Sequence, residues 1–265
     1  MSIDEAAPEL DHSRMTLAEH LHELRSRLIK VVLAVLVCSM FSFAFREQIL
    51  DFLLFPLTDV NPDTALLITD PTETLALAMK LSGYTGILLA MPVILWQLWR
   101  FITPGLYAHE KRLAIPVVGS ALALFFLGAG LAYWTMPRAL EFLQGIIPND
   151  DIEYLYSPEK YSMFAVYMMV AFGVGFEFPI ILVALQAVGV VEPATLSKGR
   201  PYAIVTIFVL VAVITPSGDP ISLLALALPM ILFYEIAIII GKLVARRRRR
   251  KEAAEASAEA SAGDS

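Results

Sequence analysis

The sequence is poor in cysteine and in charge. It holds one cysteine, Cys38, and only 17% of its 265 residues are charged. A lone cysteine excludes an internal disulfide and a cysteine-based metal cluster. The sequence also lacks a glycine-rich phosphate loop, a G-x-S-x-G nucleophile elbow and an H-E-x-x-H zinc motif, so we expect no catalytic residues, metal or cofactor. A net charge of −6 does not provide the basic footprint of a nucleic-acid-binding protein.

Apolar residues, in contrast, are abundant and lie in long runs. They make up 57% of the chain, and the mean hydropathy is +0.67. A helix needs roughly 20 apolar residues to cross a hydrocarbon layer about 30 Å thick. The runs therefore predict an all-α, polytopic membrane protein with six transmembrane helices, at about residues 28–45, 81–102, 114–136, 162–188, 202–215 and 221–241.

The positions of lysine and arginine orient these six spans. With a cytoplasmic amino terminus, 16 of the 20 lysines and arginines fall on inner segments. By the positive-inside rule, both termini are predicted to be cytoplasmic. We divide the chain into a disordered segment at 1–14, a membrane domain at 15–244, and a basic run with a disordered cytoplasmic tail at 245–265.

The stretch before the first span has a helical pattern of its own. Leucines recur at helical spacing from residue 17 to residue 28, after a capping box formed by Thr16 and Glu19. The pattern predicts an amphipathic helix on the inner membrane surface. Glu23 and Arg27 lie one turn apart on its polar face, where they are able to pair.

The fifth span is too short for a full crossing. Its 14 residues between Pro201 and Pro216 reach only about 21 Å as a helix. Two interpretations stay open: a helix packed among its neighbours, or a site where the bilayer is thinned.

Glu177 is an ionisable residue within the fourth span. Placing a charge there costs about 2.5–3.5 kcal/mol on insertion scales, so such a residue is a functional candidate by default. The alternative is a protonated structural glutamate bonded to a neighbouring helix. Glu235 in the sixth span lies nearer the cytoplasmic end, where it can snorkel toward water, and we interpret it as structural.

The first inner connection, residues 101–112, places Phe101 near Glu110. A carboxylate beside an aromatic ring can bind a guanidinium through two hydrogen bonds while the ring stacks on its flat face. The simpler alternative is that Glu110 pairs with neighbouring Lys111 or Arg112, which the chemistry alone favours.

Several signatures in this order, between six spans, resemble the TatC family, the polytopic core of the twin-arginine protein translocase. The resemblance runs from about Met15 to Val244. It rests on residues 20–28 (HLHELRSRL), 101–110, 172–179, 199–202 (GRPY) and 215–219 (TPSGD). One departure is Leu75, where the family usually has phenylalanine.

The resemblance implies a concave six-helix bundle that acts as a receptor in the cell membrane. It would bind twin-arginine signal peptides of folded cargo through Glu23, Arg25, Phe101 and Glu110. Glu177 would contact TatA- or TatB-type single-span partners within an oligomeric complex in the membrane lipid. The proton motive force would drive protein export by this complex. Pro56 and Asp219 would have structural roles in an outer cap.

Two other classes compete with this receptor. The first is a proton-coupled secondary transporter with Glu177 as its coupling carboxylate. Such a transporter needs a midplane cavity lined by several polar groups, and Glu177 has few charged companions in the spans. The second is an intramembrane enzyme, which the missing catalytic pairs disfavour.

Overall fold

The computed structural model describes residues 17–60, 62, 65–102, 114–146, 155–187, 190–215 and 218–262. Within these residues the fold consists of helices and one isolated backbone bridge, between Leu66 and Tyr156. The helices are α1 (Leu17–Ala44), α2 (Arg46–Val60), α3 (Pro71–Ile102), α4 (Ala114–Gly145), α5 (Pro158–Ala187), α6 (Pro193–Lys198), α7 (Arg200–Ile214) and α8 (Pro220–Ala262).

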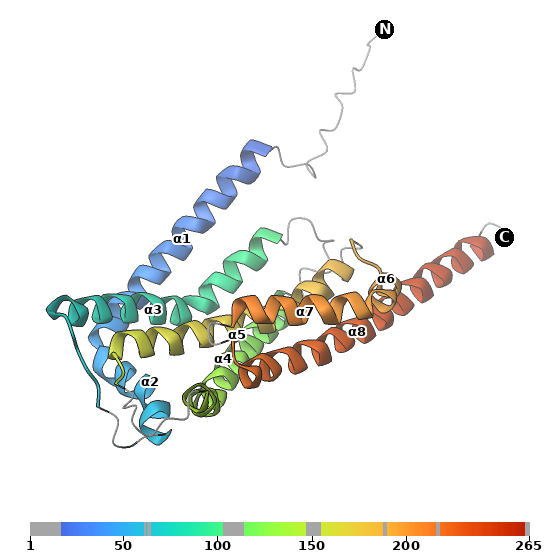
Figure 1. The fold of residues 1–265 in the computed structure, drawn as a ribbon. Coiled ribbons are helices and arrows are strands. Elements are labelled where there is room, and N and C mark those ends of the chain that lie inside the picture. Colours follow the sequence, from blue (N-terminus) through green and yellow to red (C-terminus); the bar gives the residue numbers. More distant parts are fainter. Residues whose placement is uncertain are drawn as a thin grey trace, which may run out of the picture.

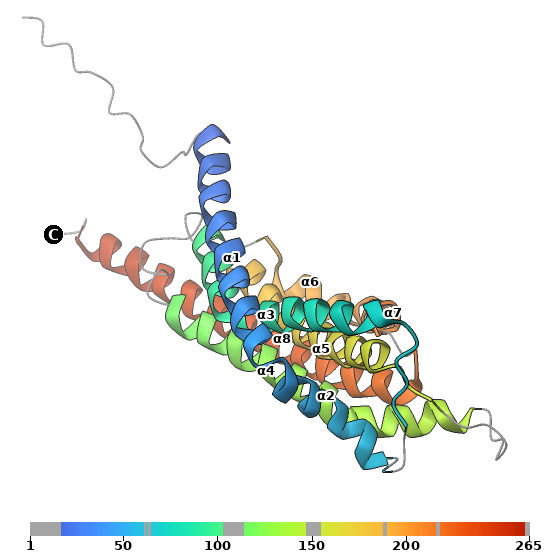
Figure 2. The ribbon, with the colours of Figure 1, turned by 90° about the vertical axis from the view of Figure 1, so that its left-hand side faces the viewer.

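The helices form a bundle with α5 at its centre (Figures 1 and 2). Helix α5 packs against α3, α4 and α8, while α1 packs along α3 at one edge and α7 along α8 at another. Helix α1 begins, and α3 and α8 end, on the same side of the bundle, whereas α2 lies toward the opposite end (Figure 1). This arrangement is the all-α polytopic bundle that the sequence predicts.

Five of the helices are long and apolar enough to cross a membrane, and α7 is a shorter apolar helix. These six correspond in order to the six predicted spans. Most are longer than predicted because polar residues at their ends continue the helix beyond the apolar run. Helix α7 has 15 residues, which make about 22 Å at about 1.5 Å per residue, so it stays shorter than the hydrocarbon layer.

The structure differs from the sequence-based expectation at both ends of the chain. Residues 17–28 form the first turns of α1, continuous with the span, and do not make a separate helix on the membrane surface. At the other end, α8 runs on through the basic segment to Ala262, where we expected a disordered tail. Alanine, glutamate, lysine and arginine are strong helix formers, so an existing helix extends through them at little cost.

Helix α2 is an element that hydropathy does not indicate. It lies between the first two spans and buries Leu53, Pro56 and Leu57. The ring of Phe52 stacks on Tyr133 of α4 at 4.4 Å, and the Tyr133 hydroxyl donates to the Phe52 carbonyl at 2.8 Å. A 15-residue amphipathic helix is too short and too polar for a span, and tertiary contacts hold it in place.

Close approach at glycine joins the central helices. A Cβ atom added to Gly128 on α4 would lie 2.6 Å from the carbonyl oxygen of Phe172 on α5. On α5, a Cβ added to Gly173 would lie 2.6 Å from the ring of Phe125 on α4. Small residues let helix backbones approach in membranes, where van der Waals packing replaces the hydrophobic effect as the force between helices. These contacts fix the rotation of α5, and with it the direction of Glu177.

We predict that Gly128→Ala destabilises the bundle, because the new methyl group meets backbone that cannot move aside. The expected loss is about 1–3 kcal/mol, partly offset by alanine's better helix propensity. Gly130→Ala on the same helix meets nothing within 4 Å and serves as the control. Thermal unfolding in detergent should show a lower Tm for Gly128→Ala only; equal Tm values for the two variants would contradict this account of the packing.

Candidate functional site

A polar cleft opens between α1 and α3 on the side where α1 begins. Glu23 on α1 forms an ion pair with Arg27 one turn later, as the sequence predicts. Arg27 also reaches across to α3, where Nη1 lies 3.4 Å from the carbonyl oxygen of Gln97. The second carboxylate oxygen of Glu23, Oε2, is buried and accepts no hydrogen bond from the part of the chain that the structure describes.

The cleft has a volume of about 160 Å³ and holds three basic residues and one acid. Its lining residues are Glu23, Ser26, Arg27, Lys30, Gln97 and Arg100. Lys30 and Arg100 are among the cations of the inner segments, and neither was predicted as a site residue. Helical spacing could have indicated this cleft from the sequence. Glu23, Arg27 and Lys30 are four and three residues apart, and Gln97 and Arg100 are three apart, so each set lies on one face of its helix.

The other predicted peptide-binding residues are only partly brought together. Arg25 is exposed on α1 and does not line the cleft. Phe101 is half-buried at the end of α3, next to Arg100. Glu110 lies outside the described residues, so the predicted proximity of Phe101 and Glu110 stays a prediction.

Glu177 lies on an open, apolar face of α5. It shares that face with Val174 and Ile181, whose side chains are 51% and 54% exposed. Glu177 itself is half-buried, and its Oε1 has no hydrogen-bond partner among the described residues. The adjoining face of α5 is closed by packing on α8, where the rings of Phe176 and Phe233 meet at 5.2 Å. Glu177 therefore lies half-buried between two exposed apolar residues, with Oε1 buried and without a described hydrogen-bond partner.

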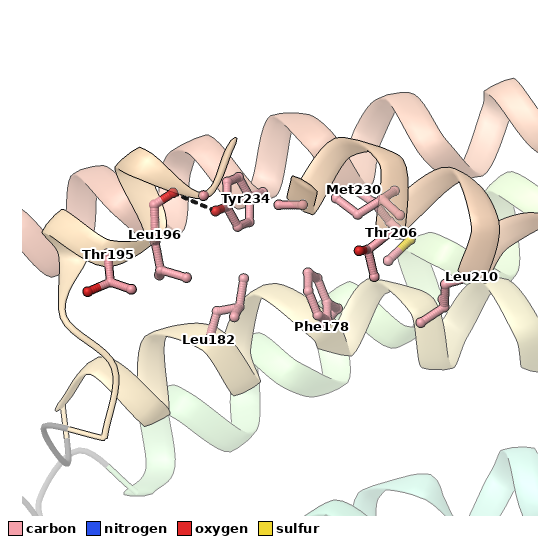
Figure 3. A pocket seen from close by; sticks show the side chains of 11 residues that line it. Phe178, Leu182, Thr195, Leu196, Thr206, Leu210, Met230 and Tyr234 are labelled. Atoms are coloured by element: carbon pink, nitrogen blue, oxygen red, sulfur yellow. Dashed lines mark hydrogen bonds between the residues drawn. The ribbon is translucent and has the colours of Figure 1, made fainter. Parts of the chain in front are cut away.

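A larger cavity is lined by Phe178, the residue after Glu177, but not by Glu177 itself. Its volume is about 330 Å³, and it is bounded by α5, α6, α7 and α8 (Figure 3). The polar side chains lining it are Thr195, Thr206 and Tyr234, and the Tyr234 hydroxyl donates to the Leu196 carbonyl at 2.7 Å. The remaining lining is apolar. This cavity lacks the convergent charged and polar groups of an ion- or solute-coupling site.

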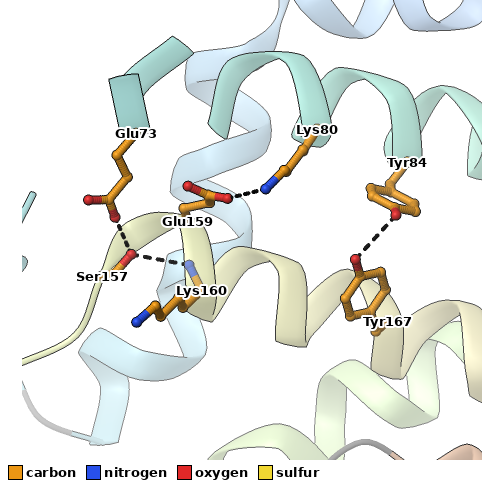
Figure 4. A network of polar contacts seen from close by, with 7 residues as sticks. All are labelled: Glu73, Lys80, Tyr84, Ser157, Glu159, Lys160 and Tyr167. Carbon is orange, nitrogen blue, oxygen red and sulfur yellow. Dashed lines mark hydrogen bonds and ion pairs between the residues drawn. The ribbon is translucent and has the colours of Figure 1, made fainter. Parts of the chain in front are cut away.

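At the opposite end from the cleft, polar contacts hold α3 to α5 (Figure 4). Ser157 donates to the carboxylate of Glu73, Lys80 pairs with Glu159 at 2.5 Å, and the hydroxyl of Tyr167 donates to that of Tyr84 at 3.2 Å. Just before α3, the carboxylate of Asp70 accepts hydrogen bonds from the backbone N–H and the hydroxyl of Thr72, which lower the pKa of Asp70. These contacts order the chain around the start of α3.

The two residues assigned to an outer cap occupy defined structural positions. Pro56 is buried within α2. Asp219 is 1% exposed and caps α8, where its Oδ1 accepts the backbone N–H of Ser222 at 2.7 Å. The preceding Gly218 has a φ of 60°, a left-handed conformation that favours glycine. Leu75, the departure from the family pattern, is 66% exposed, so it leaves no gap in the bundle.

The fold and these charges define a polytopic helical membrane protein with a charged cleft at one end and a lone carboxyl group on its apolar flank. A model of the family described as Sec-independent protein translocase protein (TatC) matches residues 19–229. The chain belongs to the TatC family. It is thus a multi-pass membrane protein and a translocase component, not an enzyme.

Relatives and solved structures agree with this family. The chain is 42% identical to the TatC protein of Aquifex aeolicus over 237 residues, which cover 89% of this chain and 98% of that protein. It is 40% identical to TatC of Magnetococcus marinus, over 90% of this chain and 88% of that protein. A crystal structure of the twin arginine translocase receptor TatC superposes with a TM-score of 0.72 at 42% identity, over 85% of this chain and 99% of that chain.

We predict that Asp219→Ala loosens the first turn of α8, because the N–H of Ser222 loses its acceptor. Loss of such a cap costs about 0.5–2 kcal/mol, whereas Asp219→Asn keeps an acceptor oxygen and should behave like the native chain. Hydrogen exchange of the Ser222 amide checks this prediction. Equal protection of that amide in the alanine and asparagine variants would rule out the capping role.

Proposed function

We propose that this protein is the signal-peptide receptor and organising core of a twin-arginine translocase in the cell membrane, with both termini in the cytoplasm. It binds the twin-arginine signal peptides of folded proteins and recruits TatA- or TatB-type single-span subunits for export driven by the proton motive force. The observation that carries the proposal is the carboxylate of Glu23, held beside α3 with one oxygen unbonded.

Glu23 is suited to accept a guanidinium from an incoming peptide. Its Oε1 is engaged by Arg27, and its Oε2 is a buried acceptor without a described donor, so a guanidinium that enters the cleft would satisfy it. Glu110 supplies the second carboxylate of the proposed site, Phe101 a ring for stacking, and Arg25 a further polar contact. A lysine lacks the planar fork of donors that fits a carboxylate, so paired arginines are preferred over paired lysines.

Glu177 is the proposed contact for a partner helix. A single-span helix that covers the stripe of Val174, Glu177 and Ile181 would bury the rest of Glu177 and supply a hydrogen-bond partner for its carboxyl group. A polar group in hydrocarbon is stabilised by such a bond, which supports recruitment at this face. The short α7 lies beside α8, where neighbouring lipid has less hydrophobic length to match.

Pro56 and Asp219 support the opposite end of the bundle in this proposal. Both are buried, one in α2 and one at the start of α8. The rival secondary transporter finds less support, because the larger cavity is mostly apolar and Glu177 does not line it.

We predict that Glu23→Gln weakens binding of a twin-arginine signal peptide roughly tenfold to a hundredfold, since hydrogen bonds to charged groups contribute about 1.5–3 kcal/mol. Glu110→Ala should weaken binding similarly. The measurement is photo-crosslinking of a signal peptide to membranes that contain the full chain, titrated with peptide. A peptide with paired lysines should label weakly.

Two variants make this experiment specific. Arg27→Gln breaks the same ion pair but keeps the Glu23 carboxylate, so labelling should persist. Glu192→Gln removes an exposed acid at the start of α6 that caps no backbone group, and it controls for net charge. Equal labelling of every variant by both peptides would remove the receptor assignment.

We predict that Glu177→Leu reduces contact with a single-span partner roughly threefold to thirtyfold, which corresponds to one interhelical hydrogen bond of about 0.6–2 kcal/mol. A photo-crosslinker at Ile181 on the same stripe reports the contact. A crosslinker at Leu127, 58% exposed on α4, should not label the partner. Glu177→Gln retains a hydrogen-bonding group and should keep most of the signal. Undiminished labelling from Ile181 in Glu177→Leu would disprove the contact.

A further inference from the structure

The α1–α3 cleft gathers positive charge that the described protein does not neutralise. Arg27, Lys30 and Arg100 line it against a single carboxylate, that of Glu23. Three other described cations pair with acids: Arg46 with Glu47, Lys80 with Glu159, and Arg200 with Glu235. Lys30 and Arg100 form no ion pair or hydrogen bond with any described residue. Two cations in the cleft are thus left without a counterion.

The cleft also contains an unsatisfied donor. The Nε of Arg27 is buried and has no acceptor within the described residues. A buried N–H without an acceptor is costly, and an oxygen anion placed in the cleft would relieve that cost. The volume of about 160 Å³ far exceeds the roughly 10–15 Å³ that one water needs, so a larger group can enter.

The apolar surroundings of the cleft indicate where such an anion comes from. Leu28 and Ile29 on α1 are 58% and 49% exposed, and Leu98 on α3 is 51% exposed. In sequence these residues lie within two positions of the basic ones, in helices apolar enough to span a membrane. A phospholipid carries both a phosphate for the basic residues and acyl chains for the apolar residues, whereas a free anion has no apolar group to contact them.

We propose that the α1–α3 cleft binds the phosphate of an anionic phospholipid headgroup. Arg27, Lys30 and Arg100 contact the phosphate oxygens, and the exposed leucines and isoleucine contact the acyl chains. Basic residues at the membrane surface attract anionic lipids, and a cleft adds a defined position to that attraction. Glu23 of the proposed receptor site lines the same cleft, but lipid binding needs no signal peptide and is tested in its absence.

The test is thermal stabilisation of the detergent-solubilised full chain by added phosphatidylglycerol, phosphatidylcholine or inorganic phosphate. A ligand that binds the folded state raises the Tm with a concentration dependence that gives its affinity. Phosphatidylglycerol should stabilise the native chain, and the other two should not. The double variant Lys30→Gln/Arg100→Gln should bind phosphatidylglycerol roughly tenfold to thirtyfold more weakly.

The matched control is Lys198→Gln/Lys242→Gln, which removes two exposed charges outside the cleft. It should bind like the native chain, and so should the charge-preserving variant Lys30→Arg/Arg100→Lys, which guards against a simple folding defect. Equal weakening in both glutamine doubles would show diffuse surface attraction and overturn the site. Stabilisation by inorganic phosphate as strong as by lipid would overturn the lipid assignment, and no stabilisation by phosphatidylglycerol would overturn the proposal as a whole.

Discussion

The cost of placing charge in hydrocarbon governs the architecture of this protein. Water is absent from the bilayer core, so backbone groups must bond within helices and charged side chains must lie at helix ends or find partners. The sequence obeys this constraint over most of its length, with charges gathered between the apolar runs. Glu177, in an apolar stripe of α5 without a described partner, is the clearest departure from it.

Both candidate regions follow from that constraint. At the end of the bundle where α1 begins, α1 and α3 extend their charged turns side by side, and a cleft with mixed charge results. On the flank of α5, the same cost makes a half-buried carboxyl group a feature that another helix can stabilise. One region therefore suits a ligand that comes from water or from the lipid headgroups, and the other suits a ligand that comes from within the membrane.

Close packing between helices fixes how α5 and its side chains are oriented. Gly128 and Gly173 bring α4 and α5 together until backbone and ring touch, and Phe176 meets Phe233 of α8. With α3, α4 and α8 packed against α5, Glu177 lies on the part of α5 that these helices leave half-open. At the other end of α3, the contacts of Glu73 and Lys80 with the start of α5 hold the two helices together. A rigid frame of this kind lets one edge of the bundle bind ligands without rearranging the core.

The sequence by itself determined the class of protein, the order of six apolar helices and the pairing of Glu23 with Arg27, because hydropathy and helical spacing are local properties. Hydropathy did not indicate helix α2. The continuity of α1 and the run of α8 to Ala262 also differ from what the local pattern predicts. Only the tertiary structure decided that Lys30 and Arg100 share a cleft with Glu23, and that Glu177 is half-buried on α5 between the exposed Val174 and Ile181. Which faces of two helices meet depends on contacts between residues some seventy positions apart, such as Arg27 and Gln97, and no local periodicity specifies those contacts.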